Sequence, residues 1–200
     1  MAIDPKKVLV GAPDQSPTTG AVNYADTSAT PPQNAKEALS GFTPCGYVSE
    51  DGLTLSTDYG TTKIKDWSKS TVRTLLDEFS GTVTFAFIQT DYESLCAIFG
   101  SDYVVKTAAT ASQGERITVK LGAHLAPARS YAFNMKDGDA RVRVYLPNAQ
   151  ASLDGDLTFV AGDAITWNVK LECGVDQNGE SIYIMTDDGV FAGSSGVQGA

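Results

Sequence analysis

The sequence predicts a mainly antiparallel β protein, a sandwich or partial barrel of about eight to ten strands with one short α-helix. Residues 165–173 alternate strictly between apolar and polar side chains, which is the pattern of a strand with one buried face. Shorter alternating runs lie at 117–121, 131–135 and 141–145. Asp137-Gly138 lies between the last two and is a strong signal for a tight hairpin.

The middle of the chain predicts a hairpin followed by the helix. Residues 71–76 and 82–89 are rich in β-branched and aromatic residues, and Ser80-Gly81 between them is a turn signal. A polar loop is expected at 56–60. Thr90 and Glu93 have the spacing of a capping box, and Gly100 is a suitable residue to end the helix. The helix should direct four apolar side chains mostly inward, namely Leu95, Ala97, Ile98 and Phe99.

The last third of the chain predicts further strands separated by turns. Residues 101–114 indicate a loop or a weak edge strand. Asn178-Gly179 is a turn signal before a last expected strand at 181–185. From the phase of their strands, Trp67 and Trp167 are both expected to be buried.

Three regions are expected along the chain: an extended N-terminal arm at 1–45, a β domain at 46–186 and a flexible C-terminal tail at 187–200. The arm holds six of the eight prolines, and within it only Val8–Val10 has the composition of a short strand. It is either a strap over a neighbouring copy or a disordered tail. The β domain should then stay soluble without residues 1–44.

The chain is acidic, with a net charge of −9 and a pI of about 4.5. This argues against tight binding of nucleic acid, because affinity for phosphates comes from Lys and Arg. The charge is also uneven: residues 101–150 hold seven basic and four acidic residues, whereas 151–200 hold one basic and eight acidic residues. Oppositely charged segments suit copies that meet head to tail, although both could be solvated strand faces.

No pattern of catalytic or cofactor-binding residues emerges. The single histidine, His124, argues against a metal cluster or a Ser-His-Asp arrangement. The three cysteines have no zinc spacing, and we expect Cys45, Cys96 and Cys173 to be reduced packing residues. The paired aspartates beside glycines favour turns over calcium sites. We expect no enzyme activity, no metal, no cofactor and no membrane span.

Several segments together resemble the major tail tube proteins of long-tailed bacteriophages, particularly those that infect actinobacteria. They are the run Gly46 to Gly52, the segment Lys63 to Trp67, Val72 to Thr74 with the hairpin that follows, and the acidic helix start after Gln89-Thr90. The resemblance implies a virion protein that is made in the host cytoplasm. It also implies six-membered rings that stack into a hollow tube, through which double-stranded DNA passes without specific binding. Tape measure, tail tip and terminator proteins are the other implied partners.

The resemblance also supplies candidate site residues. An acidic lumen would use Glu172, together with Asp163 and Asp176. A loop that contacts neighbouring subunits in this family makes Tyr47, Asp58 and Tyr59 interface candidates, and the basic segment adds Arg141 and Arg143. The competing function is a receptor-binding or carbohydrate-binding β-sandwich of a virion or cell surface.

Overall fold

The computed structural model describes residues 7–14 and 21–191, and the predictions for 1–6, 15–20 and 192–200 lie outside the described residues. One helix and ten strands are present in this part of the chain. They are β1 (Val22–Asp26), β2 (Thr43–Pro44), β3 (Val48–Lys65), β4 (Thr71–Phe87), α1 (Tyr92–Phe99), β5 (Val104–Thr107), β6 (Arg116–Val119), β7 (Arg129–Asp137), β8 (Ala140–Leu153), β9 (Trp167–Gly174) and β10 (Tyr183–Asp187). The prediction of a mainly antiparallel β protein with one short helix is confirmed.

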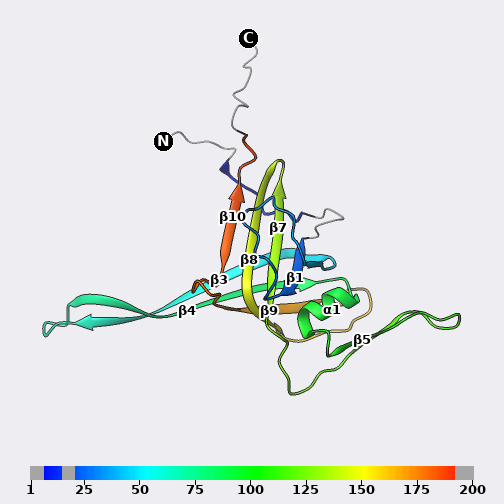
Figure 1. The fold of residues 1–200 in the computed structure, drawn as a ribbon. Coiled ribbons are helices and arrows are strands. Elements are labelled where there is room, and N and C mark those ends of the chain that lie inside the picture. Colours follow the sequence, from blue (N-terminus) through cyan, green and yellow to red (C-terminus); the bar gives the residue numbers. More distant parts are fainter. Residues whose placement is uncertain (1–6, 15–20, 192–200) are drawn as a thin grey trace, which may run out of the picture.

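Eight strands form one antiparallel sheet in the order β2-β1-β7-β8-β9-β4-β3, with β10 added beside β8. The sheet does not close into a barrel. In Figure 1, β7, β8 and β10 stand together as an upright blade, while the β3–β4 hairpin projects far to one side. The separate β5–β6 hairpin extends to the other side, where the sequence indicated a loop or weak edge strand at 101–114.

Strand β8 belongs to both parts of the sheet. Its first half pairs with β10 from Arg141 to Tyr145, and its second half pairs with β9 from Asn148 to Leu153. The change of partner falls at Pro147, which has no N–H to donate and lies at an irregularity in the β7–β8 register. The buried Ser130 hydroxyl donates to the Pro147 carbonyl at 2.7 Å and so stabilises this bend.

The core lies between one face of the sheet and α1. Val83, Leu95, Leu146 and Leu171 are at most 1% exposed, and the Tyr131 hydroxyl donates to the Ala97 carbonyl of α1 at 2.6 Å. The expected inward side chains of the helix are all buried. This packing confirms the predicted position of the helix.

The N-terminal cap of α1 is one residue later than predicted. Asp91 has an extended backbone and its carboxylate accepts the Ser94 N–H at 2.8 Å, so Asp91 replaces Thr90 as the N-cap. Thr90 instead accepts a hydrogen bond of 2.9 Å from the Trp167 indole. Gly100 ends the helix at φ 85° and donates to the Cys96 carbonyl, as expected.

The predicted turn at Ser80-Gly81 is wrong. Strand β4 runs unbroken through Gly81, and β3 runs through the expected loop at 56–60. Gly81 is required for close approach, because a Cβ atom there would lie 2.6 Å from the Ile182 side chain. The chain turns instead at 66–70, and Trp67 in this turn is 102% exposed, contrary to the prediction that it is buried.

Residues assigned to the N-terminal arm contribute to the sheet. β1 pairs with β7 over five residues, and Val22 and Ala25 are 2% and 4% exposed. The expectation that only Val8–Val10 could pair was wrong, since Val8 and Val10 are exposed and form no strand. The mixed composition of β1 concealed it, because its polar Asn23 is also buried.

Other local predictions hold. β7 and β8 are joined through the two residues after Asp137, with Gly138 at φ 58°, which confirms the hairpin. Trp167 is buried at 8% exposure, and β10 follows the predicted turn at Asn178-Gly179. The three cysteines are free; Cys96 is buried and the other two are partly buried, as expected for packing residues.

Candidate assembly surfaces

The face of the sheet that points away from α1 forms a polar wall on β3, β4, β9 and β8. Side chains alternate along these strands, so that each core residue is flanked by residues of the opposite face. Register pairs align these into two rows, one of Ser56, Thr82, Glu172 and Gln150 and the other of Thr54, Thr84, Lys170 and Ser152. We call these eight residues the polar wall. It consists mainly of hydroxyl and amide side chains with one acid and one base.

The two charges of the polar wall form an ion pair. Lys170 Nζ lies 3.2 Å from Glu172 Oε1, and the Glu172 side chain remains 67% exposed. An exposed pair of this kind contributes little to stability. Asp58 follows Ser56 by two residues on β3 and therefore extends the same face with a further acid.

The other two lumen candidates lie in turns. The Asp176 carboxylate accepts the N–H groups of Asn178 and Glu180 at 2.7 and 3.0 Å and the Tyr183 hydroxyl at 2.6 Å. These hydrogen bonds lower the pKa of the Asp176 carboxyl, and the bond from Tyr183 has the largest effect. Asp163 accepts the Ala164 N–H at 2.8 Å in the turn before β9. Of the three candidates, the structure places only Glu172 on the polar wall.

Both flanks of the polar wall lack a partner strand among the described residues. β3 pairs with β4 alone, and β8 extends beyond β7, whose register with β8 ends at Arg129↔Ala149. The backbone of β3 on one side, and of residues 150–153 on the other, is therefore open to a further strand. Open edges of this length are sites for pairing between chains.

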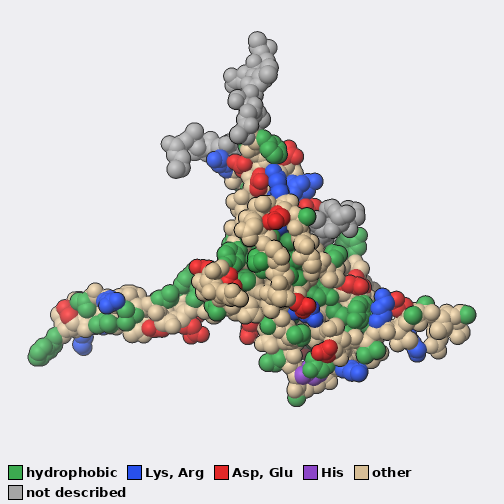
Figure 2. All heavy atoms as spheres, viewed as in Figure 1, with side chains coloured by type: hydrophobic (Ala, Val, Ile, Leu, Met, Phe, Trp, Pro, Cys, Tyr) green, Lys and Arg blue, Asp and Glu red, His purple; other side chains and the backbone are tan. Residues whose placement is uncertain are grey.

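The β3–β4 hairpin continues the core face of the sheet into solvent. Leu55 pairs with Val83 inside the domain, and four residues further out Tyr59 pairs with Phe79. These two rings pack edge to face at 5.0 Å, yet Tyr59 is 60% and Phe79 is 37% exposed, as is Leu76 at 63%. Figure 2 shows hydrophobic side chains along this projection. An apolar face without a cover on a projecting element marks a surface for a neighbour.

Tyr47, another interface candidate, lies at the opposite end of β3. It is 60% exposed and lines a cavity of about 1090 Å³ between the start of β3 and the segments around Pro13 and Met135. Its backbone is fixed on both sides, because its N–H donates to the Gln89 side chain and its carbonyl accepts from Ile88. Its exposed ring is therefore carried by a backbone that is held in place.

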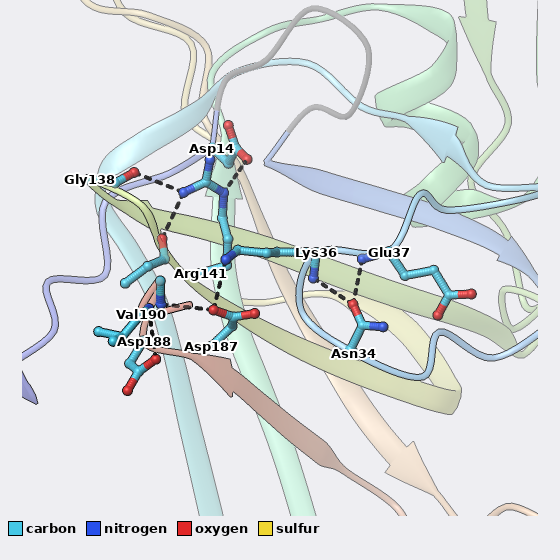
Figure 3. A network of polar contacts seen from close by, with 11 residues as sticks. Asp14, Asn34, Lys36, Glu37, Gly138, Arg141, Asp187, Asp188 and Val190 are labelled. Atoms are coloured by element: carbon cyan, nitrogen blue, oxygen red, sulfur yellow. Dashed lines mark hydrogen bonds and ion pairs between the residues drawn. The ribbon is translucent and has the colours of Figure 1, made fainter. Parts of the chain in front are cut away.

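Arg141 holds the end of the upright blade together. Its guanidinium donates to the carbonyls of Gly138 and Ala140 at 2.9 and 2.8 Å and lies 3.7 Å from the Asp14 carboxylate (Figure 3). Nearby, Lys36 binds Asp187 of β10 at 2.8 Å, a contact that lowers the pKa of Asp187. The contacts that Arg141 makes in this structure are therefore with residues of its own chain.

Arg143 is buried at 3% exposure. Its three guanidinium nitrogens donate to the Asn134 side chain at 2.7 Å and to the carbonyls of Asn34 and Glu37 at 2.9 Å each. Burial lowers its pKa. Arg143 fastens the segment before β2 onto β8, a role that the alternating pattern of residues 141–145 could not reveal.

Replacing Arg143 by Ala should destabilise the subunit by about 2–4 kcal/mol, because one buried and two partly buried acceptors lose their donor. For a chain of this size the melting temperature should fall by roughly 5–15 °C. The exposed Arg73→Ala provides the matched control and should stay near the wild-type value. Thermal unfolding by circular dichroism measures both, and an unchanged Arg143→Ala transition would contradict this assignment.

The thiols are shielded from reaction. Burial raises the pKa of Cys173 to about 11 and raises that of Cys45 and Cys96. The thiolate is the reactive form, so each cysteine is less reactive than an exposed one at the same pH.

His124 stacks on Tyr103 with ring centres 3.6 Å apart. No group of three or more His, Cys, Asp or Glu in the described ranges could hold a metal.

Alkylation of native protein at pH 8 should therefore modify Cys173 about 100-fold more slowly than alkylation of the unfolded chain, in line with a pKa raised from 9.0 to about 11. The difference in alkylation rate between native and unfolded protein should disappear above pH 11, where the thiolate dominates in both states. Differential labelling followed by peptide mass spectrometry gives the rate for each cysteine. Equal rates in native and unfolded protein at pH 8 would show that the site is not shielded.

An open antiparallel sheet with a polar wall, two unpaired flanks and a projecting apolar hairpin defines a structural β protein suited to assembly. The family model for the phage tail tube protein matches residues 1–194, and the chain therefore belongs to this family. It is a structural protein of the bacteriophage virion, located in the tail, and its family assembles with itself and with other tail proteins. A search of curated proteins found no match. The part of the chain that the structure describes contains no helix long and apolar enough to cross a membrane.

Proposed function

We propose that this subunit forms hexameric rings that stack into a hollow tube for delivery of the phage genome. The observation that carries this proposal is the polar wall with its two open flanks. In a ring, β3 of one copy would lie beside residues 150–153 of β8 in the next copy. The two flanks differ, so the contact is head to tail, and a head-to-tail contact closes into a ring when its rotation permits.

The number of strands agrees with a tube that admits DNA. Four strands of the polar wall per subunit make twenty-four in a ring of six. At about 4.8 Å between neighbouring strands the circumference is roughly 115 Å before strand tilt, which corresponds to a backbone diameter of roughly 37 Å. Side chains reduce this width, but the remaining channel is wide enough for a duplex. The same closure would remove the exposed edges that invite aggregation.

The chemistry of the polar wall supports passage without gripping. Ser and Thr hydroxyls dominate the wall, and its one base, Lys170, is paired with Glu172. Asp58 adds negative charge on the same face. Phosphates would meet few free cations, and the overall charge of −9 disfavours condensation on DNA. We expect the duplex to slide on a layer of water and ions.

Other parts of the proposal concern assembly. We infer that assembly takes place in the host cytoplasm and involves the tape measure, tail tip and terminator proteins as partners. Tyr47, Tyr59 and the basic Arg141 remain candidates for contacts between copies, whereas Arg143 has its donors engaged within the chain. The resemblance to proteins of phages that infect actinobacteria stays a prediction.

The alternative of a receptor-binding or carbohydrate-binding sandwich has one observation in its favour, the fully exposed Trp67. An aromatic ring in that position could stack on a sugar, but its neighbours in the turn, Asp66, Ser68, Lys69 and Ser70, include neither a second aromatic ring nor an amide side chain. Glycan-affinity chromatography of the monomer separates the two functions. Retention on a glycan column without assembly at any concentration would favour the alternative.

The proposed function is tested by electron microscopy of purified protein at increasing concentration. Rings with six subunits and tubes of stacked rings are expected. The lumen should fill with negative stain. Sedimentation velocity on the same samples should show a monomer that converts to large species. A monomer that persists at the highest concentration would contradict the proposal.

A further inference from the structure

The cavity at the start of β3 lies against the open flank that this strand forms. Its volume is about 1090 Å³, and its apolar lining includes Leu53 and Phe85. Among the described residues its lining holds no Lys or Arg but three acids, which are Glu50, Asp91 and Glu93. A cavity of this size exceeds the voids that a packed domain normally leaves. It is therefore an apolar site with an acidic border.

One polar group of this cavity lacks a hydrogen bond. Ser49 lines the cavity, and its hydroxyl oxygen is buried without a hydrogen-bond partner in the described part of the chain. Most buried hydroxyl groups in proteins are hydrogen-bonded, because a buried polar group without a partner costs free energy. Tyr47 and Ile88 also line the cavity and remain 60% and 42% exposed. The cavity thus has the features of a site that an occupant completes.

The chain between β6 and β7 has the complementary composition. Residues 121–125, which we call the Leu125 loop, read Leu-Gly-Ala-His-Leu, and Leu121 and Leu125 are 67% and 73% exposed. Lys120 precedes the loop, and residues 116–136 contain four Lys or Arg and no Asp or Glu. Figure 2 shows hydrophobic side chains around the histidine at the lower end of the body. An apolar loop in a basic segment matches an apolar cavity with an acidic border.

The Leu125 loop is held in place at both ends. At its start the Lys120 N–H donates to the Tyr103 carbonyl at 2.9 Å, and at its end the Ala126 carbonyl accepts from the Gln150 side chain at 2.8 Å. Within the loop the His124 ring stacks on Tyr103. The two exposed leucines are therefore presented on an ordered loop, which reduces the entropy lost when a partner covers them.

The loop and the cavity lie on opposite flanks of the polar wall. The bond from Gln150 places the loop beside the open flank of β8, whereas the cavity lies at β3. β9 and β4 separate these flanks, so three strand spacings of about 4.8 Å, roughly 14 Å in all, lie between them. In Figure 1 the chain between β6 and β7 descends below the body, away from β3. Both sites are on the side of α1, because the cavity includes Asp91 and Glu93 at its start and the loop contacts Tyr103 beyond its end.

We propose that the Leu125 loop of one subunit fills this cavity in the adjacent subunit of the ring, with Leu121 and Leu125 on the apolar lining and Lys120 facing the acidic border. This inference rests on the proposed function, because pairing of β3 with residues 150–153 of the next copy brings the loop and the cavity to one seam. The paired strands close the seam on the side of the polar wall, and the loop closes it on the side of α1. An apolar centre with a charged rim is the usual anatomy of an interface.

Photocrosslinking identifies the occupant of the cavity directly. Leu125 is replaced by the photoreactive amino acid p-benzoylphenylalanine, and this variant is mixed with a large excess of ¹⁵N-labelled wild-type protein under assembly conditions. Crosslinks from the probe to labelled peptides covering 43–53 or 85–93 are expected. The same probe at Ile184, which is 59% exposed on β10, serves as the control and should not label these peptides.

The other outcomes contradict the inference in distinguishable ways. Crosslinks from position 125 to unlabelled peptides alone would show that the loop contacts its own subunit, which overturns the inference. Crosslinks to other surfaces of the labelled copies would overturn it as well. A wild-type protein that forms no assembly would contradict both this inference and the proposed function. Normal rings in which position 125 misses the cavity would contradict only the inference.

Two substitutions of opposite charge give an independent test. Leu125→Asp brings an acid to the acidic border and should raise the critical concentration for assembly at least about 30-fold. Leu125→Lys is the matched control, because it removes the same apolar side chain but brings a base, and it should raise the critical concentration by about 10-fold or less. Leu125 is exposed in the monomer, so both variants should keep the wild-type circular dichroism spectrum. An effect of less than about 3-fold for Leu125→Asp, or equal effects of the two substitutions, would overturn the proposed contact.

Discussion

Replacing residues 59–79 by Asn-Gly is expected to yield a folded monomer that no longer assembles. Asp58 and Ser80 form a register pair, so a two-residue turn can close the shortened hairpin between them. The removed segment carries Tyr59, Leu76 and Phe79 in exposed positions, and none of them belongs to the core. The subunit should therefore keep its stability and lose the apolar face and the tip that serve its neighbours.

Circular dichroism, thermal unfolding and electron microscopy check this prediction on one sample. The melting temperature should stay within about 3 °C of the wild type, since roughly 1 kcal/mol or less is at stake in exposed residues. No rings or tubes should form at concentrations that assemble the wild type fully. Tubes of normal length from the shortened protein would exclude the hairpin from assembly.

Deleting residues 1–44 is expected to unfold the subunit. The deletion removes β1, whose Val22 and Ala25 are buried, and leaves the edge of β7 and part of the core open to water. It also removes the Asn34 and Glu37 carbonyls that satisfy buried Arg143. Losses of this kind are comparable with the 5–15 kcal/mol by which domains are normally stable. A separable arm would instead leave the β domain soluble after the deletion, as the sequence predicted.

The measurement is thermal and urea unfolding, with amide spectra of the truncated protein. We expect no cooperative transition and poorly dispersed amide signals. A control in the same region, Val8→Ser with Val10→Ser, changes only exposed side chains and should leave the transition within about 1 °C of the wild type. A truncated protein with a cooperative transition close to the wild type would show that β1 is dispensable.

The elements that could be predicted from the sequence are those specified by neighbouring residues. The alternation around Trp167, the turn after Asp137 and the helix ending at Gly100 each depend on contacts within a few residues. The errors arise where one residue type serves two physical purposes. Gly81 resembled a turn glycine, but its missing Cβ makes room for Ile182 from a distant segment.

The assembly surfaces were only partly predictable for the same reason. Glu172 could be placed on a polar strand face because alternation fixes it, and the structure puts it on the polar wall. The buried role of Arg143 depends on the segment at 34–37, more than 100 residues away in the sequence. Likewise, Trp67 was assigned to a buried strand position because its strand was expected to continue, whereas the Asp66 turn ends it. Nonlocal partners leave no periodic pattern in a sequence.

The most direct test of the account is a cryo-electron microscopy reconstruction of the assembled protein. It should show the Thr82, Glu172 and Gln150 row on the channel surface, with β3 of each subunit hydrogen-bonded to residues 150–153 of the adjacent one and α1 on the outside. A lumen lined by α1 or by the β5–β6 hairpin, or flanks of the sheet that stay unpaired between neighbours, would contradict it.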